Sequence, residues 1–171
     1  MNSWSLGFKK VYEDHSQMVF NLALQYTQNA EDAQEITQDV FVKVHEKMGS
    51  FSGKSELRTW IYRISINESL DYLKAKKRKK RSFLFLSQNP DQIENQAVNF
   101  DHPGVLLENQ EELLTLFEKI NDLPSNQKTA LILLKIEGLP QSEVAKIMKV
   151  SEKAVESLFQ RAKLNLKNKL N

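Results

Sequence analysis

The strongest constraint on the fold is the pattern of residues 123–171. An apolar run follows Leu123-Pro124 and stops at Gly138-Leu139-Pro140. Residues 141–148 then allow only about two helical turns, and Val150-Ser151 precedes a final helix rich in Lys and Arg. Short helices joined by tight turns in this order are typical of a helix-turn-helix, which places its second helix in a groove of duplex DNA. The pattern therefore predicts a helical C-terminal domain with DNA as its ligand.

Residues that interrupt helices are scarce in the whole chain. The 171 residues include five Gly, four Pro and no Cys, which favours long helices and excludes disulfides and thiolate metal sites. No apolar run approaches the roughly 20 residues needed to cross a bilayer. The first residues also lack the basic start and apolar core of a signal peptide. We therefore predict an all-α cytoplasmic protein with no membrane insertion.

Apolar residues recur at helical spacing in three segments of the N-terminal half. The spacing predicts helices over residues 5–26 and 56–80, with a helix between them that is N-capped by Asn29 and ends at Gly49. Helical periodicity is lost from residue 82 onward and returns from residue 106 to residue 120. We therefore predict two small helical domains, residues 1–81 and 109–171, joined by an acidic linker, residues 82–108.

Charge is distributed unevenly, although the net charge is only +2. Seven of the eight residues from 74 to 81 are basic, whereas residues 82–118 carry seven acidic residues and no Lys or Arg. Residues 146–169 again carry seven basic residues against two acidic ones. This patterning predicts two phosphate-binding surfaces separated by a spacer that does not bind.

The predicted final helix has a polar face beside its apolar stripe. Ser151 is expected as its N-cap, and the face carries Lys153, Glu156, Ser157, Gln160, Arg161 and Lys163. Gln pairs with adenine and Arg with guanine in the major groove, while Lys suits phosphates. An ordinary solvated helix face has the same polarity, so that alternative stays open.

Aromatic and cationic residues are interleaved within residues 51–81. Bases stack on aromatic rings and cations hold phosphates, so this mixture suits single-stranded nucleic acid. The rings are Phe51, Trp60, Tyr62 and Tyr72. The spacing of Trp60 and Tyr62 also fits packing in a core. The basic run is harder to explain by packing, because seven neighbouring cations repel one another without a polyanion.

Three blocks of the sequence resemble the sigma-70 family of bacterial RNA polymerase sigma factors. Residues 29–41 (NAEDAQEITQDVF) resemble the family's second conserved block, and residues 51–67 (FSGKSELRTWIYRISIN) resemble its promoter-melting block. Residues 123–166 resemble the domain that binds the upstream promoter element. The order of the blocks, with no middle domain, is similar to the extracytoplasmic-function (ECF) group. The resemblance implies a promoter-specificity subunit without a cofactor, a metal site or catalysis of its own.

The resemblance also implies partners and residue roles. Core RNA polymerase would bind through its β′ clamp coiled coil and its β flap, and the residues implied at the coiled coil are Glu35, Gln38 and Asp39. A flipped base of the non-template strand in the −10 element would enter the loop of Phe51, Ser52, Gly53, Lys54 and Ser55. Asn67 would contact bases where melting begins. Backbone phosphates would be held by Arg63, Lys74, Lys76, Lys77, Arg78, Lys79 and Lys80. The final helix would read the −35 element as duplex DNA, and an anti-sigma factor is the implied regulator.

Three residues depart from the family pattern. Pro140 stands where a Ser or Thr cap is common, and Ala154 and Glu156 replace a Thr and a basic residue. A carboxylate repels phosphate but accepts a hydrogen bond from cytosine. We therefore expect the −35 preference of this chain to differ from that of its relatives.

Two other function classes compete with this interpretation. A free-standing helix-turn-helix regulator would bind operator DNA as a dimer, but it leaves residues 51–67 unexplained. An enzyme would need a paired nucleophile and base or a metal cluster. His15, His45 and His102 lie in separate segments without such pairing.

Overall fold

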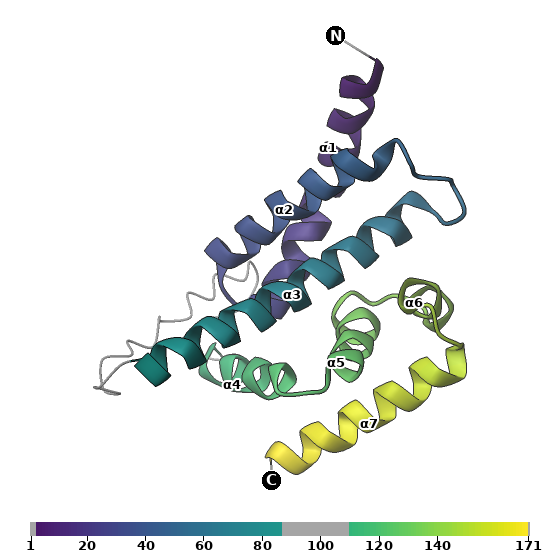
Figure 1. Ribbon diagram of the computed structural model, residues 1–171. Helices are drawn as coiled ribbons and strands as arrows, with labels where there is room; N and C mark the ends of the chain where they lie inside the picture. Colours follow the sequence, from purple (N-terminus) through teal and green to yellow (C-terminus); the bar gives the residue numbers. More distant parts are fainter. Residues whose placement is uncertain (1–2, 87–109, 171) are drawn as a thin grey trace.

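The computed structural model describes residues 3–86 and 110–170, and the regular elements in these ranges are all helices (Figure 1). In chain order they are α1 (Ser3–Thr27), α2 (Ala30–Met48), α3 (Leu57–Leu86), α4 (Gln110–Asn121), α5 (Ser125–Leu131), η3 (Ile132–Ile136), α6 (Gln141–Met148) and α7 (Glu152–Leu170). The predicted all-α fold with a C-terminal helix-turn-helix is confirmed. Most of the predicted linker, and His102 with it, lies outside the described residues.

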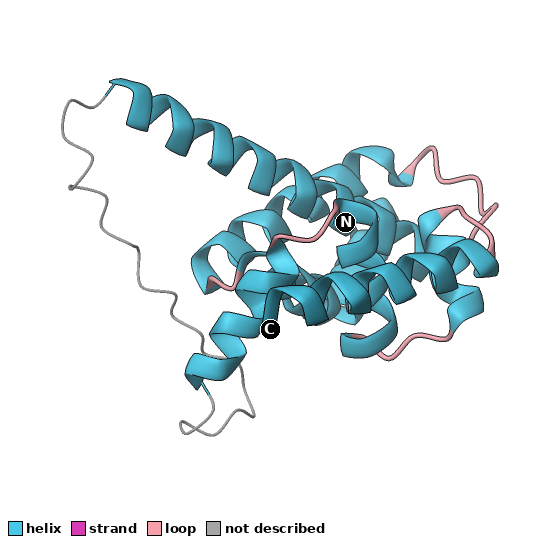
Figure 2. Cartoon of the chain, turned by 90° about the horizontal axis from the view of Figure 1, so that it is seen from below, coloured by secondary structure: helices cyan, strands magenta, loops and turns pink. Residues whose placement is uncertain are grey.

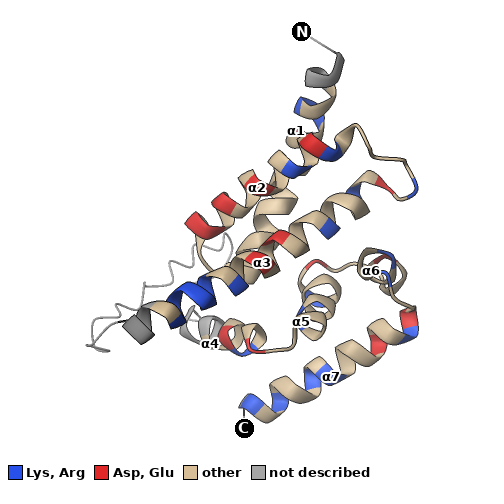
Figure 3. Cartoon of the chain, in the orientation of Figure 1, with Lys and Arg blue, Asp and Glu red and all other residues tan. Residues whose placement is uncertain are grey.

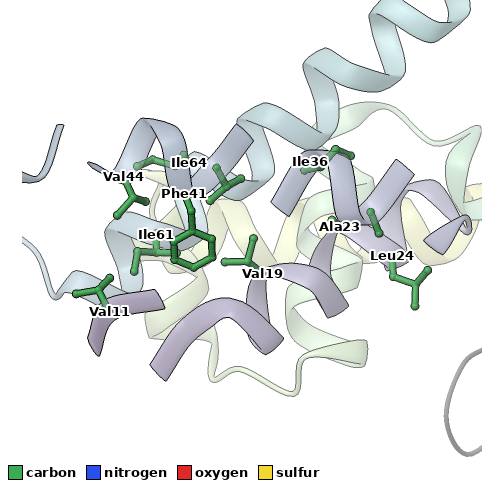
Figure 4. Packing of buried hydrophobic residues seen from close by; sticks show 11 residues of the cluster. Val11, Val19, Ala23, Leu24, Ile36, Phe41, Val44, Ile61 and Ile64 are labelled. Atoms are coloured by element: carbon green, nitrogen blue, oxygen red, sulfur yellow. The ribbon is translucent and has the colours of Figure 1, made fainter. Parts of the chain in front are cut away.

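Helices α1, α2 and α3 form an N-terminal bundle around one apolar core (Figure 4). Asn29 caps α2 as predicted, because its Oδ1 accepts a 2.8 Å hydrogen bond from the backbone N–H of Asp32. Tyr62 is fully buried and Trp60 packs against the core, as the packing alternative predicted. The core residues are Val11, Val19, Ala23, Leu24, Ala33, Ile36, Val40, Phe41, Val44, Ile61 and Ile64.

Helix α3 is longer than the apolar pattern indicates. It runs through the basic residues 74–81 and continues to Leu86, five residues into the segment predicted as linker. Lys and Arg are good helix formers, so the loss of an apolar stripe does not end the helix. The basic run is consequently a helix surface (Figure 3).

The helix-turn-helix itself lies within a C-terminal domain formed by α4–α7. Residues 132–136 form a π-helical turn, η3, after α5, where a single helix was expected up to Gly138. Gly138 has a φ of +66°, a conformation that favours glycine. Helix α6 spans Gln141–Met148, the two turns predicted, and Lys149 ends it with a left-handed φ of 56°. Ser151 caps α7, since its Oγ accepts a 3.1 Å bond from the N–H of Ala154.

The two domains pack against each other (Figure 2). A small cluster that includes Phe117, Leu131 and Ala162 holds α4, α5 and α7 together within the C-terminal domain. A second cluster crosses between domains: Leu22, Tyr26, Tyr62 and Ile66 of the N-terminal bundle are buried with Ile132, Leu133, Leu139, Val144, Ala145, Ile147 and Val155. This arrangement brings α3 beside α6.

Candidate nucleic-acid interface

The basic run of α3 presents a continuous cationic face to solvent. Every Lys and Arg from residue 74 to residue 81 is exposed, and one hollow on this face is lined by Asp71, Lys74, Lys77, Arg78 and Arg81. Lys76 instead pairs with α2, where its Nζ lies 2.5 Å from Oδ2 of Asp32. The exposed cations of this face are therefore suited to bind a polyanion. Lys76 is already paired within the bundle.

Tyr72 fixes this part of α3 against the start of α2. Its hydroxyl donates to Oδ1 of Asp32 at 2.7 Å and to Oε2 of Glu35 at 3.2 Å. Burial, followed by the hydrogen bond to Asp32, raises the pKa of Tyr72 well above its ordinary value. Tyr72 is thus a tether between helices, and its ring is not presented beside the cations as a stacking platform.

The loop of residues 51–55 connects α2 to α3 and is anchored at one end. The Phe51 ring lies 5.0 Å from the Trp60 ring, at an interplanar angle of 41°. Ser52, Gly53 and Lys54 are exposed. Gly53 has a φ of +68° with nothing near its Cα that a side chain would meet, so glycine is needed there for the turn rather than for space. An anchored aromatic beside open loop residues suits the capture of a single base.

Arg63 and Asn67 lie on the side of α3 that faces the C-terminal domain. The Arg63 guanidinium donates to the backbone carbonyls of Lys146 and Ile147 at 2.7 and 3.2 Å. Asn67 is exposed and lines a cleft of about 260 Å³ between the two domains. The structure thus separates these two residues from the solvent-facing cations at 74–81.

The predicted polymerase-binding residues share one exposed face of α2. Glu35, Gln38 and Asp39 are all exposed. Partial burial, then the charge of Glu35 and that of Glu68, raises the pKa of Asp39. Beside it, Lys43 Nζ lies 2.5 Å from Glu68 Oε1 and links α2 to α3. An acidic face of this kind complements a basic partner.

An apolar groove adjoins this acidic face and was missed by the sequence reasoning. It is lined by Phe8, Tyr12, Gln38, Phe41, Val42, His45 and Glu46. Tyr12 is 45% exposed and Val42 is 56% exposed, although both are large apolar residues. Val42 carries the missing signal, because it interrupts the polar outer face of α2 between Asp39 and Glu46. Exposed apolar surface next to charges is typical of a protein-binding site.

Helix α7 presents the polar face predicted for DNA reading. Ser151, Lys153, Glu156, Gln160, Arg161 and Lys163 are exposed, and Ser157 is half-buried. Gln141 Nε2 donates to the Glu152 carbonyl at 2.6 Å, which ties the start of α6 to the start of α7. The Lys163 and Lys135 ammonium groups lie 4.9 and 5.4 Å from the centre of the Phe159 ring. A hydrogen bond thus connects the start of the presented face to the preceding helix.

The part of the chain that the structure describes has neither a metal-binding cluster nor a membrane-spanning helix. Residues 3–86 and 110–170 contain no group of three or more His, Cys, Asp or Glu side chains arranged to hold a metal ion. None of the helices in these ranges is both long and apolar enough to span a membrane.

Comparison with known proteins gives the family. The family described as Sigma-70 region 2 matches residues 11–79, and the one described as Sigma-70, region 4 matches residues 113–166. The ECF RNA polymerase sigma-E factor of Escherichia coli strain K12 is 33% identical over 148 residues, covering 81% of this chain and 74% of that protein. The chain belongs to the ECF group of the sigma-70 family.

Other relatives extend the likeness over nearly the whole chain. The ECF RNA polymerase sigma-E factor of Haemophilus influenzae is 29% identical over 173 residues, covering 96% of this chain and 87% of that protein. The structure of the sigma factor RpoE in complex with the anti-sigma factor NepR from Bartonella quintana matches with a TM-score of 0.67 at 21% identity, covering 96% of each chain. This structural likeness shows that the fold is shared.

The two family regions correspond to the two domains of this sigma factor. Region 2 includes α2, the loop of residues 51–55 and α3 as far as Lys79. Region 4 includes α5, η3, α6 and most of α7. Both candidate DNA surfaces, on α3 with its loop and on α7, thus lie in the regions that define the family.

Proposed function

We propose that the two domains of this promoter-specificity subunit read two promoter elements. In region 2, the loop of residues 51–55 captures a flipped non-template base of the −10 element, and the cations of α3 hold the displaced strand. In region 4, α7 enters the major groove of the −35 element. Residues 1–81 then form the melting domain, residues 82–108 the linker and residues 109–171 the −35 reader.

The observation that carries this proposal is the contrast between the two DNA surfaces. The surface of α3 and its loop combines exposed cations with an anchored aromatic ring, which suits unpaired bases. The surface of α7 is one exposed face of a single helix with Gln160, Arg161 and Lys163, which suits duplex DNA. A dimeric regulator of duplex DNA would have no use for the first surface.

The proposed partners follow from the surfaces of region 2 and from the relatives. Core RNA polymerase would bind the acidic face of α2 through its β′ clamp coiled coil, with Val42 and Tyr12 adding apolar contact. An anti-sigma factor is a further proposed partner, because a related sigma factor is solved with one. The proposed site of action is the cytoplasm, where the polymerase works, and the catalysis belongs to the polymerase.

Transcription from a promoter library tests the function. The purified chain is mixed with core RNA polymerase and a library of random promoter sequences, and the transcripts are sequenced at their 5′ ends. We expect starts that share two upstream motifs and that depend on the added chain. Transcripts that show no sequence preference would contradict the proposal, and DNA binding without polymerase would favour a free-standing regulator.

A further inference from the structure

Glu156 is the residue of α7 that is hardest to reconcile with a DNA-binding surface. Helix α7 carries five Lys and Arg residues and two acidic ones, and both acidic residues lie in its first two turns (Figure 3). Most protein contacts to DNA are made to phosphates, which repel a carboxylate. An exposed carboxylate on this surface is therefore compatible with DNA only where it meets a hydrogen-bond donor of a base.

Glu156 lies on the part of α7 that a recognition helix inserts into the major groove. It shares one face with Lys153, Ser157 and Gln160, because residues three, four and seven positions apart lie side by side on a helix. Lys153, Glu156 and Gln160 are exposed, and Ser157 is half-buried. A recognition helix contacts base edges through residues near its N-terminus. Glu156 and Gln160 therefore lie where bases are read.

Other polar side chains of α7 are engaged along their own helix. The Arg161 Nε donates to the carbonyl of Ser157, four residues earlier, at 3.3 Å. The Lys163 ammonium lies 4.9 Å from the centre of an aromatic ring of the same helix. Within the described ranges, no hydrogen bond or ion pair engages the side chains of Glu156 and Gln160. These two side chains are consequently free to contact bases.

Two lysines offset the repulsion between Glu156 and the phosphates. Lys153 precedes Glu156 by three residues and Lys163 follows it by seven, so both lie on its side of the helix. Both lysines are exposed. Their ammonium groups can hold the phosphates on either side of the groove, which leaves the carboxylate facing the bases between them.

The edges of the bases in the major groove differ in what they offer a carboxylate. A carboxylate only accepts hydrogen bonds. Cytosine presents its N4 amino group as a donor, whereas guanine presents two acceptors and thymine an acceptor and a methyl group. Adenine presents a donor next to an acceptor, and this pair matches the amide of Gln but not a carboxylate. Glu156 is therefore suited to cytosine, and Gln160 is suited to adenine.

The spacing of the two side chains fits neighbouring base pairs. Four residues of α-helix rise by about 6 Å, which is close to two base-pair steps of about 3.4 Å. We propose that Glu156 and Gln160 set the −35 preference of this sigma factor, with Glu156 selecting a cytosine and Gln160 selecting an adenine within two base pairs of it. The inference rests on the proposed function of α7 and adds the bases that this helix selects.

Exchanging the two side-chain chemistries tests the assignment. The variants are Glu156→Gln and Gln160→Glu, and Glu152→Gln is the matched control, because it removes the same charge from another exposed position of α7. Each variant is assembled with core RNA polymerase, and transcript starts are sequenced from a library with random promoter sequences. Thermal unfolding checks that each variant is folded.

We expect each variant to change one base of the −35 motif. Glu156→Gln should replace a preference for cytosine by a preference for adenine at one position, with about a tenfold change in the relative use of the two bases. Gln160→Glu should make the opposite change within two base pairs of that position. Glu152→Gln should leave both preferences unchanged, and the −10 motif should stay the same in all three variants.

A carboxylate that acts only as a surface charge gives a different result. Glu156→Gln would then raise promoter use equally for all −35 sequences, as Glu152→Gln would, and this outcome would overturn the inference. A wild-type −35 motif without a cytosine and an adenine within two base pairs would also overturn it. The proposed function itself fails only if the wild-type starts share no upstream motifs, so the two failures are distinguishable.

Discussion

The Phe51 ring lies 5.0 Å from the Trp60 ring and anchors the loop of residues 51–55 to the first turns of α3. Trp60 also packs against the core of the N-terminal bundle, whereas the next three loop residues are exposed. The pair therefore joins a structural residue to a proposed base-binding loop. Changes at the two rings should consequently have different effects.

We predict that Phe51→Ala slows promoter opening by about tenfold, because stacking contributes about 1–3 kcal/mol per base. Trp60→Ala should instead lower the free energy of unfolding by about 3 kcal/mol. Opening is measured by permanganate reactivity of unpaired thymines, and stability by denaturant unfolding. The two variants could instead lose the same free energy of unfolding, with Phe51→Ala opening promoters no more slowly than Trp60→Ala. That result would count against base capture by this loop.

The cationic hollow of α3 predicts a salt dependence. Lys77→Ala with Arg78→Ala should reduce the slope of log affinity against log salt by about 1.5, because each lost phosphate contact accounts for about 0.7–0.9. Lys9→Ala with Lys10→Ala removes the same charge from exposed positions of α1 and should leave the slope unchanged. The slope is measured by holoenzyme binding to promoter DNA at several salt concentrations. An identical slope in both variants would show that the α3 cations are only solvated.

The acidic face of α2 predicts a charge-dependent contact with the polymerase. Asp39→Lys should weaken binding to core RNA polymerase by at least about tenfold, since it sets a cation against a basic partner surface. Glu13→Lys makes the same charge reversal on the exposed part of α1 and serves as the control. Binding is measured by fluorescence anisotropy of labelled sigma factor. A similar affinity for both variants would place the polymerase contact elsewhere.

Because Lys128 is buried, we predict that the free energy of unfolding depends on pH. Burial lowers the pKa of Lys128 to about 8, well below the roughly 10.4 of an unfolded chain. Between pH 8 and 10 the unfolded chain therefore binds the proton more tightly, and the free energy of unfolding should rise with pH by up to about 3 kcal/mol. Above pH 10 stability should fall, because burial raises the pKa of Tyr62 to about 12 and the unfolded tyrosine ionises first.

The variant Lys128→Met tests whether Lys128 causes the rise in the free energy of unfolding. The variant keeps an unbranched apolar side chain, one atom shorter, and has no ammonium group. The increase between pH 8 and 10 should therefore disappear while the fall above pH 10 remains. Denaturant unfolding at each pH gives the free energies. An increase of the same size in Lys128→Met would assign the effect to another group.

Local sequence signals predicted the helices well where caps and turns are explicit. Asn29 and Ser151 cap α2 and α7 through the side-chain bonds expected of them, and α6 has its predicted bounds. The π-helical turn η3 and the end of α3 were not predicted. The π-helical turn is only five residues long, too short for an apolar pattern to distinguish it from an α-helix. A basic segment can continue a helix without an apolar stripe.

The arrangement of the two domains could not be predicted from sequence. The contact between Arg63 and Lys146 joins residues 83 positions apart, and a cation near a basic run is equally typical of DNA binding. Leu22 and Tyr26 lie within the helix predicted over residues 5–26, but periodicity does not say which element covers them. Only the tertiary structure shows that region 4 does so.

Two separate promoter readers on one chain are the central claim, and transcript-start sequencing on a promoter library tests it most directly. Wild type is compared with Phe51→Ala in the loop and with Glu156→Gln on the exposed face of α7. The account predicts that Phe51→Ala changes only the −10 motif and that Glu156→Gln changes only the −35 motif. The account would be contradicted if either variant changed both motifs. It would also be contradicted if the start sites used with the wild-type protein did not share two upstream motifs.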